Sequence, residues 1–293
     1  MFRFAFLLFV STGVYANQSV DIETAARLYQ EASTRQQVRA SLGAMPEHIR
    51  RLFSADVTQL TSAQLDAVTG AAKRGFRIDV FEVPALSALA ANLDPATQKK
   101  TEAFLLSDLG RRMVAADIAT AILEESQIDK IMNGEISAKS TPQRDALFDR
   151  IEDATRSTES TVQIFLSMGQ AVAIGTAVGA GSDSSKVADG ARKSGEATRV
   201  GLEKDMKAPL RRYIAYSYRD LTDADLKELL AFLESPPGKR YVSAYIASLG
   251  AGFDAMGRRC GEQLGESLRE LAQAQMAVTT AAPPPAIAAP EHP

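Results

Sequence analysis

Few side chains in this sequence could perform catalysis or bind a metal, and they lie far apart along the chain. Histidine occurs only at His48 and His292, and Cys260 is the single cysteine. Zinc and iron sites usually draw on several His or Cys ligands, and hydrolytic triads need a positioned base. We therefore predict no metal site and no triad, and we expect His48 to be a surface residue of a helix.

Acidic residues form small clusters in two places, at Glu124, Glu125 and Asp129 and again at Asp223 and Asp225. Paired carboxyl groups can work as general acid and base, but solvated helix faces and helix caps explain these residues better. Gly238-Lys239 lacks the upstream glycine and the strand that a phosphate-binding loop requires. We therefore assign no catalytic, cofactor-binding or metal-binding residue and expect no cofactor. An enzyme of a class without His or metal stays open.

Cys260 falls within a regular apolar stripe. The stripe repeats every three or four residues and consists of Tyr241, Tyr245, Leu249, Phe253, Met256, Cys260, Leu264, Leu268 and Leu271. This spacing predicts one long helix with a single apolar face. We therefore expect Cys260 to be a buried core residue. A reactive thiol or an intermolecular disulfide is the alternative.

The elements that would position these residues come from an internal repeat. Residues 93–121 align without a gap to residues 221–249 and are identical in 13 of 29 columns. Both segments contain the pattern Ser-x-x-Gly-basic, which Ala-rich helices would not share by composition alone. A weaker match relates residues 31–35 to residues 152–156. We therefore predict a duplication.

Each copy carries the signals of a helical hairpin. Asp94 and its counterpart Thr222 suit an N-cap, and Pro95 fits the first helical position. The serine of the shared pattern can cap the next helix, and the glycine allows two helices to turn closely past each other. Further helices are expected at residues 19–42, 47–55, 62–80, 84–92, 143–179 and 186–219, and Thr61 to Gln64 forms a capping box before the third of these. No segment alternates long enough to predict a sheet.

The N-terminus has the pattern of a secretory signal peptide over residues 1–16. A positive start at Arg3 precedes an apolar run from Phe4 to Val10, and small residues end the segment at Ala16. The run is shorter than the roughly 20 apolar residues that cross a bilayer. We therefore expect a periplasmic protein without a stable membrane span after cleavage. Its net charge of −3, without a basic patch, argues against nucleic acid as a partner.

The uncharged segment 160–182 permits two interpretations. Gly175 and Gly179 form a small-xxx-small pattern of the kind that packs membrane helices. Gln163, Gln170 and the high glycine content favour a buried helix between two units instead, and membrane contact is the alternative. This segment also supplies a possible apolar groove, lined by Phe165, Leu166, Met168, Val172 and Ile174.

The residues Tyr218-Arg-Asp-Leu-Thr-Asp-Ala-Asp-Leu226, followed by Phe232-Leu-Glu-Ser-Pro-Pro-Gly-Lys239, resemble the signature of domain of unknown function 2059. That family consists of small helical proteins exported by proteobacteria. The second copy matches closely, whereas the first has Asp94 where Thr is usual. The resemblance implies an all-helical periplasmic protein and supplies no activity.

These observations predict an all-α fold with two tandem, related helical units packed together. The expected boundaries are residues 1–16 for the signal peptide, 17–135 for the first unit, 136–275 for the second, with the best family match at 205–275, and 276–293 for a disordered Ala/Pro tail. The favoured role is a non-catalytic protein-interaction or scaffold protein with an unidentified protein partner. The alternatives are a carrier or chaperone-like binder of an apolar ligand or lipid, and an enzyme of unknown class.

Overall fold

The computed structural model describes residues 19–40, 42, 50 and 61–280. Every regular element in this part of the chain is a helix, so the predicted all-α class is confirmed. The helices are α1 (Ile22–Glu31), α3 (Ser62–Gly75), α4 (Ile78–Asn92), α5 (Pro95–Leu105), α6 (Asp108–Ala121), α7 (Glu125–Asn133), α8 (Pro142–Thr155), α9 (Ser157–Gly179), α10 (Ser184–Ser217), α11 (Asp223–Leu233) and α12 (Pro236–Thr280). Residues 34–40 are also helical. The predicted signal peptide, the helix predicted at 47–55, His48 and His292 lie outside the described residues, apart from residue 50.

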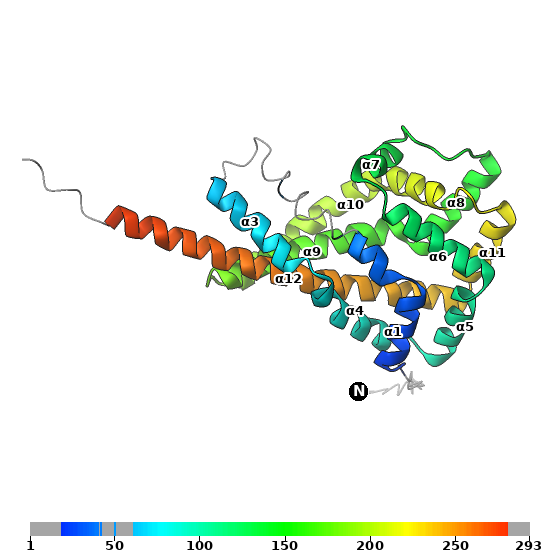
Figure 1. The fold of residues 1–293 in the computed structure, drawn as a ribbon, viewed down its shortest axis with the longest axis horizontal. Coiled ribbons are helices and arrows are strands. Elements are labelled where there is room, and N and C mark those ends of the chain that lie inside the picture. Colours follow the sequence, from blue (N-terminus) through cyan, green and yellow to red (C-terminus); the bar gives the residue numbers. More distant parts are fainter. Residues whose placement is uncertain (1–18, 41, 43–49, 51–60, 281–293) are drawn as a thin grey trace, which may run out of the picture.

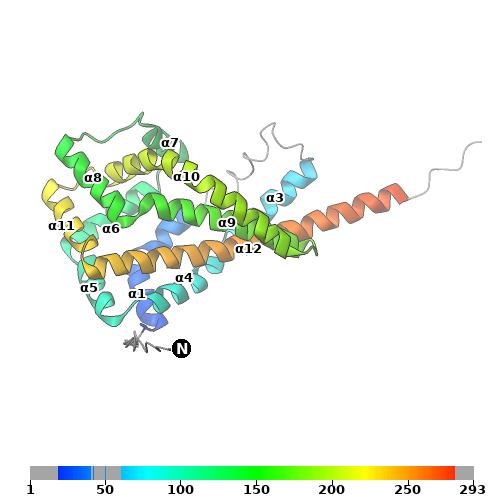
Figure 2. The ribbon, with the colours of Figure 1, turned by 180° about the vertical axis from the view of Figure 1, so that it is seen from behind.

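Helix α12 is the axis of the molecule (Figure 1). Its first half is packed within a bundle that contains α1, α4, α5, α6, α8 and α11, and its second half extends away from this bundle with α3 beside it. Helices α9 and α10 form an antiparallel pair, and α9 lies along α12 (Figure 2). The long apolar helix predicted around Cys260 is therefore confirmed, and it contacts both halves of the chain.

Two hydrophobic cores lie on the two sides of this axis. The larger one gathers residues of the first half around Leu28, Phe81 and Leu89, together with Met256 and Cys260 of α12. The smaller one gathers α8, α10 and α11. The prediction that Cys260 is a core residue is confirmed, since it is 5% exposed. Burial raises the pKa of its thiol to about 11, which disfavours the reactive thiolate.

Several predicted helix boundaries were wrong. The helix expected over 19–42 breaks at Ser33 and the helix over 143–179 breaks at Arg156, because both residues adopt a left-handed conformation with φ near +51° and +52°. Non-glycine residues rarely adopt this conformation, so hydrophobic periodicity gives no signal for it. The segment 62–80 divides at Phe76, and α4 continues through Pro84 instead of starting there. Helix α7 was not predicted, and α12 includes residues 276–280 of the predicted tail. Residues 281–293 lie outside the described part.

The two hairpin corners follow the predicted pattern. We call α5 with α6 the first hairpin, and α11 with the start of α12 the second. Ser107 accepts a hydrogen bond from the Gly110 amide at 3.0 Å, and Ser235 accepts one from the Gly238 amide at 3.1 Å. A Cβ atom on Gly110 would lie 2.0 Å from the Phe104 carbonyl oxygen. Only glycine therefore permits this close turn.

The two hairpins contact each other through equivalent Phe residues and through two ion pairs whose arginines are equivalent. The Phe104 and Phe232 rings stack with centroids 4.0 Å apart and planes 4° from parallel. Arg112 of the first hairpin pairs with Asp225 of the second at 2.7 Å, and Arg240 of the second pairs with Asp94 of the first at 2.7 Å. The two ion pairs are thus reciprocal.

Both acids of these pairs are held in the charged form. Burial acts to raise the pKa of Asp94, but hydrogen bonds from Arg240 and Thr97 outweigh it and hold this pKa below its usual value. The hydrogen bonds from Arg112 and Thr222 lower the pKa of Asp225. The reciprocal pairs therefore fix the relative position of the two hairpins at neutral pH.

Arg240→Gln is expected to lower the free energy of unfolding by about 1–2 kcal/mol at pH 7, because it leaves the carboxylate of Asp94, 11% exposed, without its cation. The depressed pKa means that this stabilisation is present above pH 4 and is lost as the pH falls further. Urea unfolding at pH 7 and pH 3 measures both effects. Arg192→Gln, which breaks only exposed pairs, is the control and should cost less than about 0.5 kcal/mol. Equal losses in the two variants would contradict the expectation.

Candidate functional site

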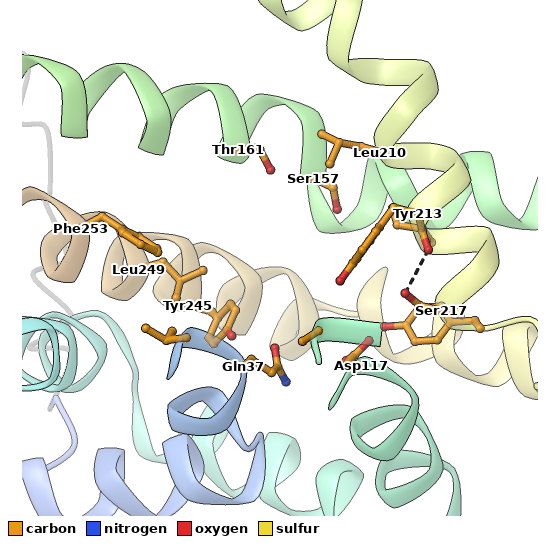
Figure 3. Close-up of a pocket in the computed structure, with 14 residues that line it drawn as sticks. Gln37, Asp117, Ser157, Thr161, Leu210, Tyr213, Ser217, Tyr245, Leu249 and Phe253 are labelled. Atoms are coloured by element: carbon orange, nitrogen blue, oxygen red, sulfur yellow. Dashed lines mark hydrogen bonds between the residues drawn. The ribbon is translucent and has the colours of Figure 1, made fainter. Parts of the chain in front are cut away.

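A cavity lies where α6, α9, α10, α12 and the helical residues 34–40 meet (Figure 3). It consists of one hollow of about 360 Å³ and an adjoining hollow of about 280 Å³. Asp117, Tyr218 and Tyr245 line both hollows. We call the two hollows together the central cavity. Its walls come from both halves of the chain.

Helical spacing explains why these side chains converge. On α6, Met113, Asp117 and Ala121 are four residues apart and therefore lie on one face of the helix. On α12, Tyr241, Tyr245 and Leu249 belong to the apolar stripe and reach the cavity in the same way. The stripe that buries α12 in the bundle thus also forms one wall of the cavity.

The α10 side supplies a further tyrosine and a serine. Tyr213 and Ser217 are four residues apart on α10, and the Ser217 hydroxyl donates a hydrogen bond to the Tyr213 carbonyl oxygen at 3.0 Å. Figure 3 shows both residues facing the space that Asp117 and Tyr245 enter from the opposite side. Leu210, Leu249 and Phe253 add apolar surface. The cavity is therefore apolar over part of its wall and rich in hydroxyl groups over the rest.

Asp117 carries the strongest electrostatic feature of the site. Burial among protein atoms raises the pKa of its carboxyl group to about 7, and a hydrogen bond with Tyr218 only partly opposes this. Among the described residues that line either hollow, Asp117 is the only one with a formal charge. A carboxyl group without a cation nearby is disfavoured in its charged form. Asp117 can therefore change protonation near neutral pH.

The tyrosines around Asp117 stay neutral. Burial, followed by the charge of Asp117, raises the pKa of Tyr213 to about 12 and that of Tyr218 well above its ordinary value. Burial likewise raises the pKa values of Tyr241 and Tyr245. These phenols are hydrogen-bond donors and aromatic surfaces over the whole physiological range. The arrangement can hold a ligand that has an apolar body and one polar group.

The acidic clusters found in the sequence do not enter this cavity. Asp223 pairs with Arg144 at 2.6 Å, and Asp225 completes the capping box of Thr222. Glu124 is the N-cap residue of α7, and Asp129 is exposed on that helix. The interpretation as caps and solvated faces is confirmed for these residues. In the described part of the chain no three His, Cys, Asp or Glu side chains gather as possible metal ligands.

The apolar groove predicted on segment 160–182 was wrong. Phe165 is 59% exposed, Leu166 lies beside Gly195 of α10, and Met168 packs against the larger core. Val172 and Ile174 are half-buried. None of the five lines the central cavity. Successive residues of an α-helix are rotated by about 100°, so Leu166 and Ile174 lie on other faces of α9 than Phe165.

Helix α9 packs closely against α12 and also pairs with α10. Gly175 and Gly261 lie where α9 and α12 meet, and a Cβ atom on Gly261 would be 2.1 Å from the Val172 carbonyl oxygen. The helix is long and apolar enough to cross a membrane by length and composition, and 28% of its apolar window is buried. The predicted core helix is thus partly buried, where it meets these two helices. Membrane contact of its remaining surface stays a prediction.

Asp117 is the functional candidate that the sequence did not reveal. The alignment of the two copies pairs Asp117 with Tyr245, so the two residues occupy equivalent positions in their hairpins. The sequence signal for this site was an acidic residue four positions after Met113, on a helix face that is otherwise apolar. Its significance depends on Tyr213 and Tyr218, which lie about a hundred residues away in the chain.

Comparison of the whole chain with protein-family models, with curated proteins and with solved structures finds no match. The resemblance to domain of unknown function 2059 therefore stays a prediction. The central cavity is the feature from which a function can be argued.

Proposed function

We propose that this protein binds a small ligand with an apolar body and one polar group in the central cavity. The observation that carries the proposal is the hollow of about 360 Å³ that residues from both halves of the chain line. Ligand sites usually have volumes of about 300–1,000 Å³, apolar walls and a few converging polar groups. Asp117, Tyr213 and Tyr245 are such polar groups, and Leu249 and Phe253 supply apolar wall.

A fluorescence titration with the neutral probe N-phenyl-1-naphthylamine tests this proposal. Ala121 lines the larger hollow near the end of α6, so Ala121→Phe would fill part of it. We expect saturable binding to the wild-type protein and at least tenfold weaker binding to this variant. Native mass spectrometry of the purified protein should also detect any ligand that co-purifies.

Ala119→Phe is the matched control, because Ala119 is exposed on the same helix two positions earlier. It adds the same side chain outside the cavity and should leave the affinity for the probe unchanged. Wild-type protein that neither binds the probe saturably nor carries a co-purified ligand would contradict the proposal. Equal binding by both variants would place the probe elsewhere.

We further propose that the chain contains two tandem units of the domain of unknown function 2059 type and is exported to the periplasm. The matching corners at Gly110 and Gly238, the stacked Phe104 and Phe232 rings, and the reciprocal ion pairs support the duplication. The sequence of residues 1–16 supports export. Recovery of the protein in the osmotic-shock fraction would test the location.

A protein-interaction role is the second candidate. It is favoured by large apolar side chains that are exposed on α9 and α10, namely Phe165 (59%), Val178 (52%) and Val200 (75%). Photo-crosslinking from Val200 in the periplasm, followed by mass spectrometry, should recover a protein partner. Repeated recovery of the protein alone would count against this role.

A further inference from the structure

The wall of the central cavity carries negative charge without a compensating positive charge among the described residues. Asp117 contributes the only formal charge among the described residues of its wall, and no Lys, Arg or His lines either hollow. Tyrosine rings approach the same space from α10 and α12. A desolvated carboxylate without a counter-ion is costly, so a bound ligand that supplied a positive charge would gain a strong partner.

We infer that the central cavity takes a small organic cation, with its ammonium group paired to Asp117 and lying against the rings of Tyr213, Tyr218 and Tyr245. This inference rests on the proposed function and adds the chemical class of the ligand. Aromatic faces attract cations within about 6 Å of the ring centroid, and the attraction grows when the cation is desolvated. Leu249 and Phe253 offer apolar surface to the remainder of the ligand.

The groups that face Asp117 from every neighbouring element agree with a cation. Helix α10 presents Tyr213 and Tyr218, and α12 presents Tyr241 and Tyr245, all of which stay neutral. Residues 34–40 present Gln37, and α9 presents Ser157 and Thr161, which are uncharged. Glu31 adds a negative charge that raises the pKa of Tyr241. An anionic ligand would therefore meet repulsion only.

The predicted binding depends on pH in a defined direction. Burial raises the pKa of Asp117 to about 7, so the free site is protonated in acid and binding of a cation releases that proton. Affinity for a permanently charged ammonium should be constant above pH 8. It should weaken about a hundredfold between pH 8 and pH 5, because two pH units below the pKa correspond to two factors of ten.

Two probes of equal shape separate charge from fit. Benzyltrimethylammonium carries the positive charge, and neopentylbenzene is its neutral carbon isostere. NMR titrations of the full chain at pH 8 should give at least tenfold tighter binding for the ammonium. Asp117→Asn should remove this preference while N-phenyl-1-naphthylamine still binds, which shows that the cavity is intact. Asp108→Asn, an exposed carboxyl on the same helix, should change nothing.

The outcomes distinguish this inference from the proposed function. Equal affinity of the wild-type protein for the two probes would overturn the cation inference and leave a cavity that binds apolar ligands. An ammonium affinity that Asp117→Asn does not change would also overturn it. Failure of both probes and of N-phenyl-1-naphthylamine to bind would overturn the proposed function with it.

Discussion

Asp117→Asn is expected to raise the free energy of unfolding by about 4 kcal/mol at pH 8 and to change it little at pH 4, because each pKa unit corresponds to about 1.4 kcal/mol. The carboxyl group has a pKa of about 7 in the folded protein and about 3.9 in the unfolded chain. The folded state therefore binds a proton that the unfolded state releases, and stability falls as the pH rises from about 4 to about 7. Asn carries no charge at any pH, so the variant lacks this loss.

Urea unfolding of both proteins at pH 4.5, 6 and 8 measures the effect as a difference that grows with pH. Asp108→Asn is the matched control, because the Asp108 side chain is 92% exposed on the same helix. Its effect on stability should be small and nearly independent of pH between 6 and 8. A difference between wild type and Asp117→Asn that is the same at all three pH values would show that Asp117 titrates normally and is not desolvated.

Gly261→Ala is expected to destabilise the protein by about 3 kcal/mol, because its new Cβ atom would lie 2.1 Å from the Val172 carbonyl oxygen. Backbone atoms cannot move aside as a flexible side chain can, so α9 and α12 would have to separate. That separation would also disturb the wall of the central cavity that α9 supplies. Thermal and urea unfolding, together with probe binding, would report both consequences.

Gly250→Ala is the control on the same helix. A Cβ atom at Gly250 would meet nothing within 4 Å, so the variant should gain about 0.5–1 kcal/mol from the better helix propensity of alanine. Opposite signs for the two substitutions are the expected signature of close packing between α9 and α12. Two stabilised variants would mean that these helices do not touch in solution.

Local signals predicted much of the fold. Thr61 forms the expected capping box, Thr222, Ser107 and Ser235 cap the helices expected of them, and Cys260 is buried as its stripe predicted. Each of these features depends on residues only three or four positions apart, which a sequence displays directly. The hairpin corners likewise depend on residues that are close together in the sequence.

Features that depend on distant contacts could not be predicted in this way. Ser33 and Arg156 adopt a left-handed conformation that their residue types do not favour, so tertiary packing decides it. The prediction of a groove around Phe165 was wrong, because the sequence does not say which face of α9 meets α12. Asp117 became a candidate only when α10 and α12 brought Tyr213 and Tyr245 to it.

A bromine-labelled ligand would test the central cavity most directly. Crystals grown at pH 8 and soaked with 4-bromobenzyltrimethylammonium should give an anomalous bromine peak inside the cavity, with the ammonium group against Asp117 and the rings of Tyr213 and Tyr245. Ordered protein with the hollow closed by its own side chains, or with bromine only on the outer surface, would contradict the account.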